Sequence, residues 1–348
     1  MNENQSIIKT STSIESSTES STSEQTLVSV LCPTYNQAPF IKQCLESLLN
    51  QQTTFRYEIL INDDCSTDGT TKIVQEYAHK YHHLVRLFLH DQNQFTQGID
   101  IIRDILLPQA KGKYIAICEG DDYWTNPDKL QHQVDLMEQE PQTGLVYTYF
   151  YKYSERQQKP TDFHFHEHEG NVYDYILASK CTIWYLTVMM RKSLMLTAPH
   201  LDTKKYFTGD IFWYYWVTLH AKTRLLREYT GVYRLLDTSV SHFMDRRKKI
   251  DFFYKSSNTR LYFVQNYPPR NQPALGRLVE KKSLINCFKY ALAHGDYTLC
   301  QSLKIPLFPL MSLKKTCYWL LHKSSCTKSS FLKISELYNH YLNKNQPA

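Results

Sequence analysis

Residues 114–124, Tyr-Ile-Ala-Ile-Cys-Glu-Gly-Asp-Asp-Tyr-Trp, join an apolar run to a dense group of carboxylates. Tyr114–Cys118 has the length and composition of a buried strand, and Gly120 ends it. Glu119, Asp121 and Asp122 follow, and carboxylates this close repel each other unless a cation lies among them. Mg²⁺ and Mn²⁺ bind carboxylates, and substrate phosphates commonly complete their coordination. The stretch therefore predicts either a metal–diphosphate site at a strand end or an acidic turn before a helix, where Asp is also favoured.

Strands alternate with helices before this stretch, and each strand leads into a polar loop. The predicted strands are Leu27–Cys32, which Pro33 ends, Tyr57–Asn62 and Leu84–Leu89. Apolar residues on one face predict helices after the first two strands, and another over Ile99–Leu107. This order predicts an α/β fold with a mostly parallel central sheet flanked by helices. Ligands of such sheets bind at the carboxyl ends of the strands, where the polar loops would meet.

Length, charge and cysteine content limit the domain number, the partners and the cellular compartment that we expect. The chain has 348 residues, 42% of them hydrophobic, enough for one large domain or a domain with an extension. A net charge of +6 is compatible with nucleotide phosphates or a membrane surface. The basic residues are widely spread and form no recognition motif, so we expect no nucleic-acid partner. Nine Cys without a CxxC pair or a secretory signal predict reduced thiols in the cytoplasm.

Three segments together resemble a known family. They are residues 28–35 (VSVLCPTY), 58–70 (EILINDDCSTDGT) and 114–130 (YIAICEGDDYWTNPDKL). In order and spacing they are similar to the signatures of glycosyltransferase family 2, of the bacterial cell-surface polysaccharide type, with the GT-A fold. The resemblance covers roughly residues 28–241. It implies an inverting, Mn²⁺- or Mg²⁺-dependent hexosyl- or N-acetylhexosaminyltransferase that uses a nucleotide-sugar, most simply a UDP-sugar. The acceptor would be a glycan or a lipid-linked glycan.

The resemblance assigns a nucleotide-binding role to residues after the first two strands. Pro33, Thr34 and Tyr35 match the loop that holds the base, and the Tyr35 ring would stack on uracil. Asp63 matches the residue that accepts a hydrogen bond from the uracil imide, as an ionised carboxylate does. The alternative for the first loop is a plain strand-ending turn.

The acidic stretch matches the metal motif of the family. Asp121 and Asp122 would share the ribose and the metal, whereas Glu119 stands where many members have Asp, which leaves its role open. Arg103 matches an Arg near the donor, or is a solvated helix residue. Trp124 would line the sugar pocket or pack under the loop.

Three later residues complete the implied site. Asp210, in the segment Phe207–Trp213, matches the general base, which an inverting transfer needs near the acceptor hydroxyl. Its alternative role is a helix N-cap. Arg234, after Gly231-Val232-Tyr233, would contact the diphosphate with its guanidinium fork. Leu235 and Leu236 follow where many members have His, and His242 would act as the third metal ligand or a diphosphate contact.

The second half also contains features outside the resemblance. Gly144–Tyr153 and Thr182–Arg191 are predicted strands, and His164, His166 and His168 alternate in the polar loop between them. Alternate His residues on one side of a strand would bind zinc, although the polar surroundings favour a solvated loop.

The chain divides into three predicted regions. Residues 1–26 are a disordered Ser/Thr-rich tail, 27–244 the catalytic domain, and 245–348 a basic helical extension. Ile305–Leu321 mixes basic, aromatic and aliphatic residues, which suits an interfacial helix at the inner face of the cell membrane. Packing on the catalytic domain and an oligomer contact are the alternatives.

Two other functions stay open. One is a GT-A-like protein that binds a nucleotide or a partner without turnover, which would neither hydrolyse nor transfer the donor sugar. The other is a nucleotidyltransferase, which would release pyrophosphate; the Gly-rich phosphate loop that would favour it is missing from the sequence.

Overall fold

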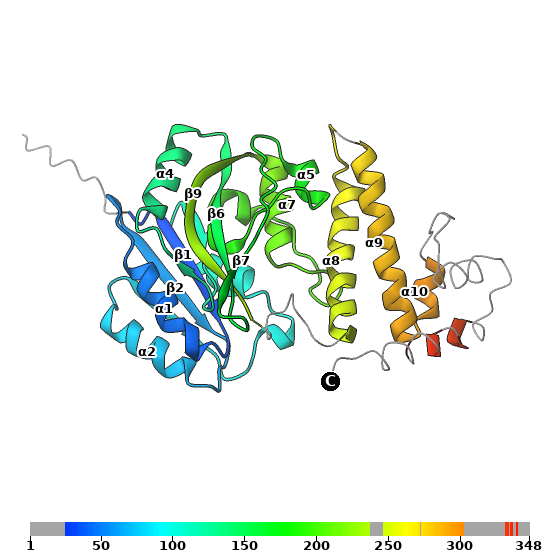
Figure 1. Ribbon diagram of the computed structural model, residues 1–348, viewed down its shortest axis with the longest axis horizontal. Helices are drawn as coiled ribbons and strands as arrows, with labels where there is room; N and C mark the ends of the chain where they lie inside the picture. The colour runs from blue at the N-terminus through cyan, green and yellow to red at the C-terminus, as the bar shows by residue number, and fades with distance from the viewer. Residues whose placement is uncertain are drawn as a thin grey trace, which may run out of the picture.

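A curled sheet forms the centre of the protein (Figure 1). The structure is a computed structural model that describes residues 25–236, 246–271, 273–302, 331–333, 335, 336 and 339. The strand order is β3-β2-β1-β4-β8-β6-β9-β5, with β7 paired to β6. The first half is parallel, with β1 between β2 and β4 and with β3 beyond β2. These strands are β1 Val28–Thr34, β2 Tyr57–Asp63, β3 Val85–Leu89 and β4 Tyr114–Ile117.

The second half of the sheet is mixed. β8 is antiparallel to both β4 and β6, whereas β6 and β9 are parallel to each other. β5 pairs antiparallel with β9, so that Tyr123 lies opposite Val232. This pairing brings the end of the acidic stretch to a strand more than a hundred positions later. The strands are β5 Tyr123–Trp124, β6 Thr143–Ser154, β7 Lys159–Thr161, β8 Met189–Arg191 and β9 Lys222–Leu235.

Helices cover both faces of the sheet. Along β1, Val30 and Cys32 face the layer of α1, α2 and α4, while Leu31 faces the layer of α5 and α7. Successive strand residues point to opposite faces, so burial of both sides produces the continuous apolar runs of these strands. The helix bounds are α1 Ala38–Leu49, α2 Thr70–Lys80, α3 Leu107–Gln109, α4 Lys129–Gln139, α5 Tyr173–Leu177, α6 Lys192–Leu196 and α7 Asp210–His220. Shorter turns are the 3-10 helices η1 Phe95–Gln97 and η3 Tyr185–Thr187, and the π-helix η2 Ile101–Leu106.

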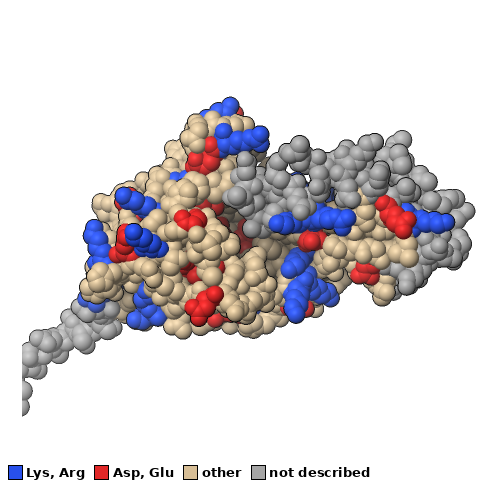
Figure 2. Space-filling model, turned by 90° about the horizontal axis from the view of Figure 1, so that it is seen from below, with Lys and Arg blue, Asp and Glu red and all other residues tan. Residues whose placement is uncertain are grey.

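The predicted C-terminal helical region is confirmed. α8 (Arg246–Asn266) stands beside α7 in Figure 1, with α9 (Pro273–His294) next to α8 and α10 (Tyr297–Ser302) next to α9. Phe263 of α8 is fully buried, and its ring centroid lies 5.7 Å from that of Phe212 and 5.1 Å from that of Tyr215. α8 therefore belongs to the core around α7. On the face seen in Figure 2, Lys and Arg side chains are interspersed with Asp and Glu among the described residues.

Several predictions fall outside the described residues: the tail up to residue 24, the boundary at 244/245, and Ile305–Leu321. Among the helices that the structure describes, none has both the length and the apolar character that crossing a membrane requires.

Two predicted element bounds were wrong. Pro33 does not end the first strand, because it continues in register opposite Asn62 and its carbonyl accepts a hydrogen bond from Gly120 N at 3.1 Å. Thr182–Arg191 is not one strand: its centre is η3, where the amide and the hydroxyl of Thr187 both donate to Trp184 O, at 2.9 and 2.7 Å. Such local hydrogen bonds compete with sheet pairing.

Candidate active site

The end of β1 joins the three polar loops. Its Pro33 carbonyl accepts from Gly120 N in the acidic loop at 3.1 Å, and its Thr34 carbonyl accepts from Asp64 N in the loop after β2 at 3.0 Å. Both contacts continue the parallel pairing of β1 with β2 and β4 beyond the strands. The structure thus brings together the loops that the sequence placed at one edge of the sheet.

The residues predicted to bind the nucleotide base lie at this edge of the sheet but differ in solvent exposure. Tyr35 has 48% of its surface exposed, so its side chain is accessible to a ligand. Thr34 is buried, and its hydroxyl donates to Gln37 Oε1 at 2.6 Å. Asp63 is buried too, and its carboxylate accepts from the amide and hydroxyl of Ser66 and from the hydroxyl of Thr71. Asp63 therefore organises its own loop.

The acidic loop contains carboxyl groups in two different environments. Asp122 is 2% exposed, and its Oδ1 accepts from Arg234 N at 2.9 Å. Glu119 and Asp121 are only partly buried. Burial, followed by the negative charges of Asp121 and Asp210, raises the pKa of Glu119 to about 8. Burial also raises the pKa of Asp121, although Arg234 and Gln37 act in the opposite direction. The protein alone therefore disfavours the ionised forms of these carboxyl groups, which a bound cation would favour.

This donor set fits a divalent cation that a substrate completes. Within the described part of the chain, no three His, Cys, Asp or Glu side chains are grouped so that they could hold a metal by themselves. His242, predicted as a third ligand, lies outside the described residues. Mg²⁺ commonly binds one or two carboxylates together with substrate phosphates, which matches a loop that carries Asp121 beside Glu119.

Arg234 comes from β9 and contacts the acidic loop directly. Its side chain donates to the Asp121 carbonyl, to Gln43 Oε1 and, from Nε, to Glu155 Oε1 at 3.0 Å. Its guanidinium also lies 4.5 Å from the centre of the Tyr123 ring. Because the protein itself occupies these donors, Arg234 has a positioning role for the loop.

Arg103 and Trp124 are both buried. The Arg103 guanidinium lies 4.5 and 4.8 Å from the ring centroids of Phe212 and Trp213. Its Nε forms an ion pair with Asp100 at 3.9 Å, and among the described residues neither Nε nor Nη2 has a hydrogen-bond partner. It is therefore not a solvated helix residue. Trp124 donates from Nε1 to Leu186 O at 2.8 Å and lies under the Lys129 ammonium, so it packs beneath the acidic loop.

Asp210 is the first residue of α7, and Gly209 is the N-cap. Its Oδ1 accepts from Ile211 N at 2.7 Å. Burial raises the pKa of Asp210 to about 6, although the Ile211 amide and the Arg260 cation oppose this rise. At neutral pH the carboxylate is mostly ionised and basic enough to accept a proton. Its negative charge also raises the pKa of Glu119 in the acidic loop.

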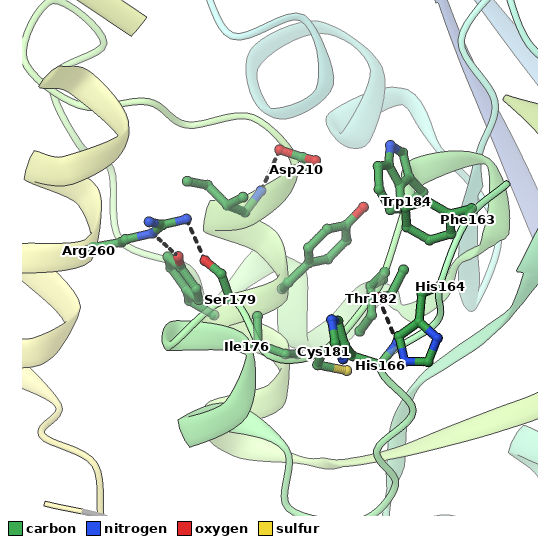
Figure 3. Close-up of a pocket in the computed structure, with 14 residues that line it drawn as sticks. Phe163, His164, His166, Ile176, Ser179, Cys181, Thr182, Trp184, Asp210 and Arg260 are labelled. Atoms are coloured by element: carbon green, nitrogen blue, oxygen red, sulfur yellow. Dashed lines mark hydrogen bonds between the residues drawn. The ribbon is translucent and has the colours of Figure 1, made fainter. Parts of the chain in front are cut away.

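A pocket of about 290 Å³ opens beside Asp210 (Figure 3). Loop residues Phe163, His164 and Trp184 form one side, and Arg260 of α8 lies on the other. Tyr214, on α7, also lines it. Sequence reasoning missed this pocket because its residues come from distant segments without a local motif. Tyr214 is one of 26 Tyr residues, and nothing near Arg260 distinguishes it.

The three alternate His residues do not converge on one point. His164 and His166 line the pocket with ring centroids 5.1 Å apart, whereas His168 stacks on Tyr175 at 3.9 Å. This arrangement does not form the zinc site that their spacing suggested.

Comparison with known proteins identifies the family. A family model described as Glycosyl transferase family 2 matches residues 29–195. The Escherichia coli UDP-Glc:alpha-D-GlcNAc-diphosphoundecaprenol beta-1,3-glucosyltransferase WfaP is 31% identical over 182 residues, which cover 52% of this chain and 67% of WfaP. The chain belongs to glycosyltransferase family 2. The resemblance of the three motifs to this family is thereby confirmed.

Two further comparisons concern this family 2 chain. An uncharacterized Mycobacterium tuberculosis protein, Rv1520, is 31% identical over 225 residues, or 64% of this chain and 63% of the relative, so the chain spans just under two thirds of it. The structure of S. aureus TarS 1-349 in complex with UDP-GlcNAc superimposes with a TM-score of 0.57 at 17% identity, covering 92% of each chain. The predicted GT-A fold is confirmed.

Proposed function

We propose that this protein is an inverting glycosyltransferase that moves a sugar from a UDP-sugar to a hydroxyl group of a glycan or lipid-linked glycan. The observation that carries this proposal is the proximity of Asp210 to the acidic loop. These groups are about ninety positions apart in the chain, yet the charge of Asp210 raises the pKa of Glu119. This supports the proposal that Asp210 is the base and that the leaving diphosphate lies at the acidic loop.

The chemical step follows from these positions. The acceptor oxygen attacks the anomeric carbon on the face opposite the diphosphate and forms the new C–O bond. The bond to the diphosphate breaks with its electron pair, and Asp210 takes the proton of the acceptor hydroxyl. Attack from the opposite face inverts the anomeric centre.

The leaving diphosphate gains negative charge beside the carboxyl groups of the acidic loop, whose pKa values are already raised by burial. Asp121, with Asp122 buried behind it, would hold Mn²⁺ or Mg²⁺ there, and the cation would neutralise the diphosphate as a Lewis acid. Arg234 holds the backbone of Asp121 in place for this role.

Related proteins support the choice of substrates. WfaP is named for UDP-Glc and for a sugar linked to diphosphoundecaprenol, and the TarS structure holds UDP-GlcNAc. We therefore propose a UDP-linked hexose or N-acetylhexosamine as donor. The proposed setting is polysaccharide assembly in the cytoplasm, with peripheral contact at the inner face of the cell membrane.

The first experiment is a thermal-shift screen of UDP, GDP and UDP-sugars with and without Mn²⁺. Ligands that bind only the folded state raise the melting temperature, so a Mn²⁺-dependent shift with UDP is expected. No shift with any nucleotide would contradict a donor site. A shift without hydrolysis or transfer would instead support the non-catalytic binding protein.

The residue test uses Asp210→Asn. Loss of the base should lower transfer by about 10²–10⁴-fold and leave the UDP shift in place. Asp135→Asn is the matched control, because it removes an exposed helix carboxylate from α4. Full transfer activity of Asp210→Asn would exclude Asp210 as the base. Inversion is tested separately, by determining the anomeric configuration of the product with NMR.

A further inference from the structure

The pocket beside Asp210 is large enough to receive one sugar residue. Its volume of about 290 Å³ lies near the lower end of the ~300–1,000 Å³ that ligand pockets occupy. Asp210 lines the pocket, so a hydroxyl group bound there would lie next to the proposed base (Figure 3). The pocket is thus placed to receive the acceptor.

The walls of the pocket offer contacts that suit a sugar ring. Phe163 and Trp184 form an aromatic pair, with ring centroids 5.0 Å apart, and such rings provide an apolar surface for the faces of a pyranose. Tyr214 is 3% exposed, and its hydroxyl has no hydrogen-bond partner within the described structure. A buried polar group without a partner is costly, so this hydroxyl is available to a ligand.

The charges in the pocket distinguish it from a site for a neutral sugar. Arg260 is the cationic residue among its lining side chains, and Asp210 is the acidic one. Arg260 donates from Nε to Tyr215 Oη at 2.9 Å and from Nη2 to Ser179 Oγ at 2.8 Å. Both partners are neutral hydroxyls, and Arg260 forms no salt bridge with a carboxylate in the part of the chain that is described. These two bonds leave three of the five guanidinium N–H groups for another acceptor.

Two histidines extend this donor set. His164 and His166 line the pocket across from Arg260 (Figure 3), and each imidazole carries at least one N–H group that can donate. Guanidinium and imidazole N–H groups form their strongest hydrogen bonds with carboxylate and phosphate oxygens. Because Arg260 forms no salt bridge among the described residues, its charge and the nearby donors favour an anionic ligand.

We propose that this pocket binds an acceptor sugar that carries a carboxylate or phosphate group, with Arg260 as the residue that selects it. This inference rests on the proposed function of Asp210 and assigns the chemical class of the acceptor. It also gives α8 a part in specificity, because the helix supplies the selecting cation from outside the motifs of the family.

The test measures binding of three glycosides that differ only at C6: methyl β-glucoside, methyl β-glucuronide and methyl β-glucoside 6-phosphate. Ligand-observed NMR titrations with the full chain and saturating UDP report their Kd values without requiring transfer. At least tenfold tighter binding is expected for one or both charged glycosides. The tighter of the two identifies carboxylate or phosphate as the recognised group.

Variants connect this preference to the residue. Arg260→Gln should remove the preference, and Arg260→Lys should keep part of it, because a Lys keeps the charge but not the planar fork. Arg277→Gln is the matched control, since it removes an exposed guanidinium from α9, and it should keep the full preference. Equal binding of the three glycosides, no binding of either charged one, or an unchanged preference in Arg260→Gln would overturn the proposal.

The UDP thermal shift separates this result from the proposed function. A normal Mn²⁺-dependent UDP shift without a charge preference would contradict only the acceptor class. Absence of both the UDP shift and transfer would contradict the glycosyltransferase mechanism itself. The same shift, measured on Arg260→Gln, verifies that the variant is folded.

Discussion

The surroundings of Asp210 raise its pKa, and we therefore expect sugar transfer to depend on pH. The protein packed around its carboxyl raises the pKa to about 6. A base acts only when it is deprotonated, so kcat/KM should fall about tenfold per pH unit below this value and level off above it. A pH profile of transfer with saturating Mn²⁺ measures this. A rate that stays constant well below pH 6 would contradict the assignment.

The same raised pKa predicts a cost in stability. The pKa of Asp210 rises from 3.8 to about 6 on folding, so the folded state binds more protons than the unfolded state between these values. Stability contributed by this group therefore falls as the pH rises through that window. Asp210→Asn should raise the melting temperature at pH 7.5 and change it little near pH 4. Asp135→Asn again serves as control, and a lower melting temperature at pH 7.5 for Asp210→Asn would contradict the prediction.

At the scale of elements, the acidic loop depends on close packing against the end of β1 and the start of α1. A Cβ atom at Gly120 would lie 2.5 Å from Gln37 Oε1, 2.7 Å from Thr34 Oγ1 and 2.8 Å from Ile41 Cδ1. Gly120→Ala should therefore displace the loop, lower stability by about 1–3 kcal/mol and weaken the Mn²⁺-dependent UDP shift. Thermal shifts with and without UDP separate the two effects.

Gly276→Ala provides the comparison for this variant. Gly276 is buried in α9, where the nearest atom to an added Cβ is Pro269 Cδ at 3.1 Å. It should alter the melting temperature without altering the UDP shift. An unchanged UDP shift in Gly120→Ala would show that the loop tolerates displacement.

The strands and their loops were predictable because their signals are local. The apolar run of β4 and the carboxylates after it are adjacent in sequence, and the parallel pairing of β1 with β2 and β4 places their loops at one edge. The Arg234 contacts and the pocket were not predictable, because they depend on which distant segments meet. No local pattern reveals that Arg234 contacts the Asp121 backbone or that Arg260 and Asp210 line the same pocket.

At the scale of the whole molecule, α8 completes the core of the catalytic half. Phe263 is fully buried among the aromatic residues of α7, whereas Phe253 on the same helix is 43% exposed. Phe263→Ala should lower the free energy of unfolding by about 3–5 kcal/mol, and Phe253→Ala by less than about 0.5 kcal/mol. Urea unfolding followed by circular dichroism measures both. Similar small losses for the two variants would mean that α8 is a separate unit.

The pairing of β5 with β9 also determines when the site is completed during synthesis. Asp122 emerges from the ribosome 112 residues before Arg234, whose amide bonds to its carboxylate. Translation at ~5–20 residues per second leaves that carboxylate without this partner for about 5–20 seconds. A nascent chain that ends before Lys222 would carry every motif of the acidic loop without the strand that holds it. We therefore expect UDP binding to begin only after β9 has left the exit tunnel, late in translation.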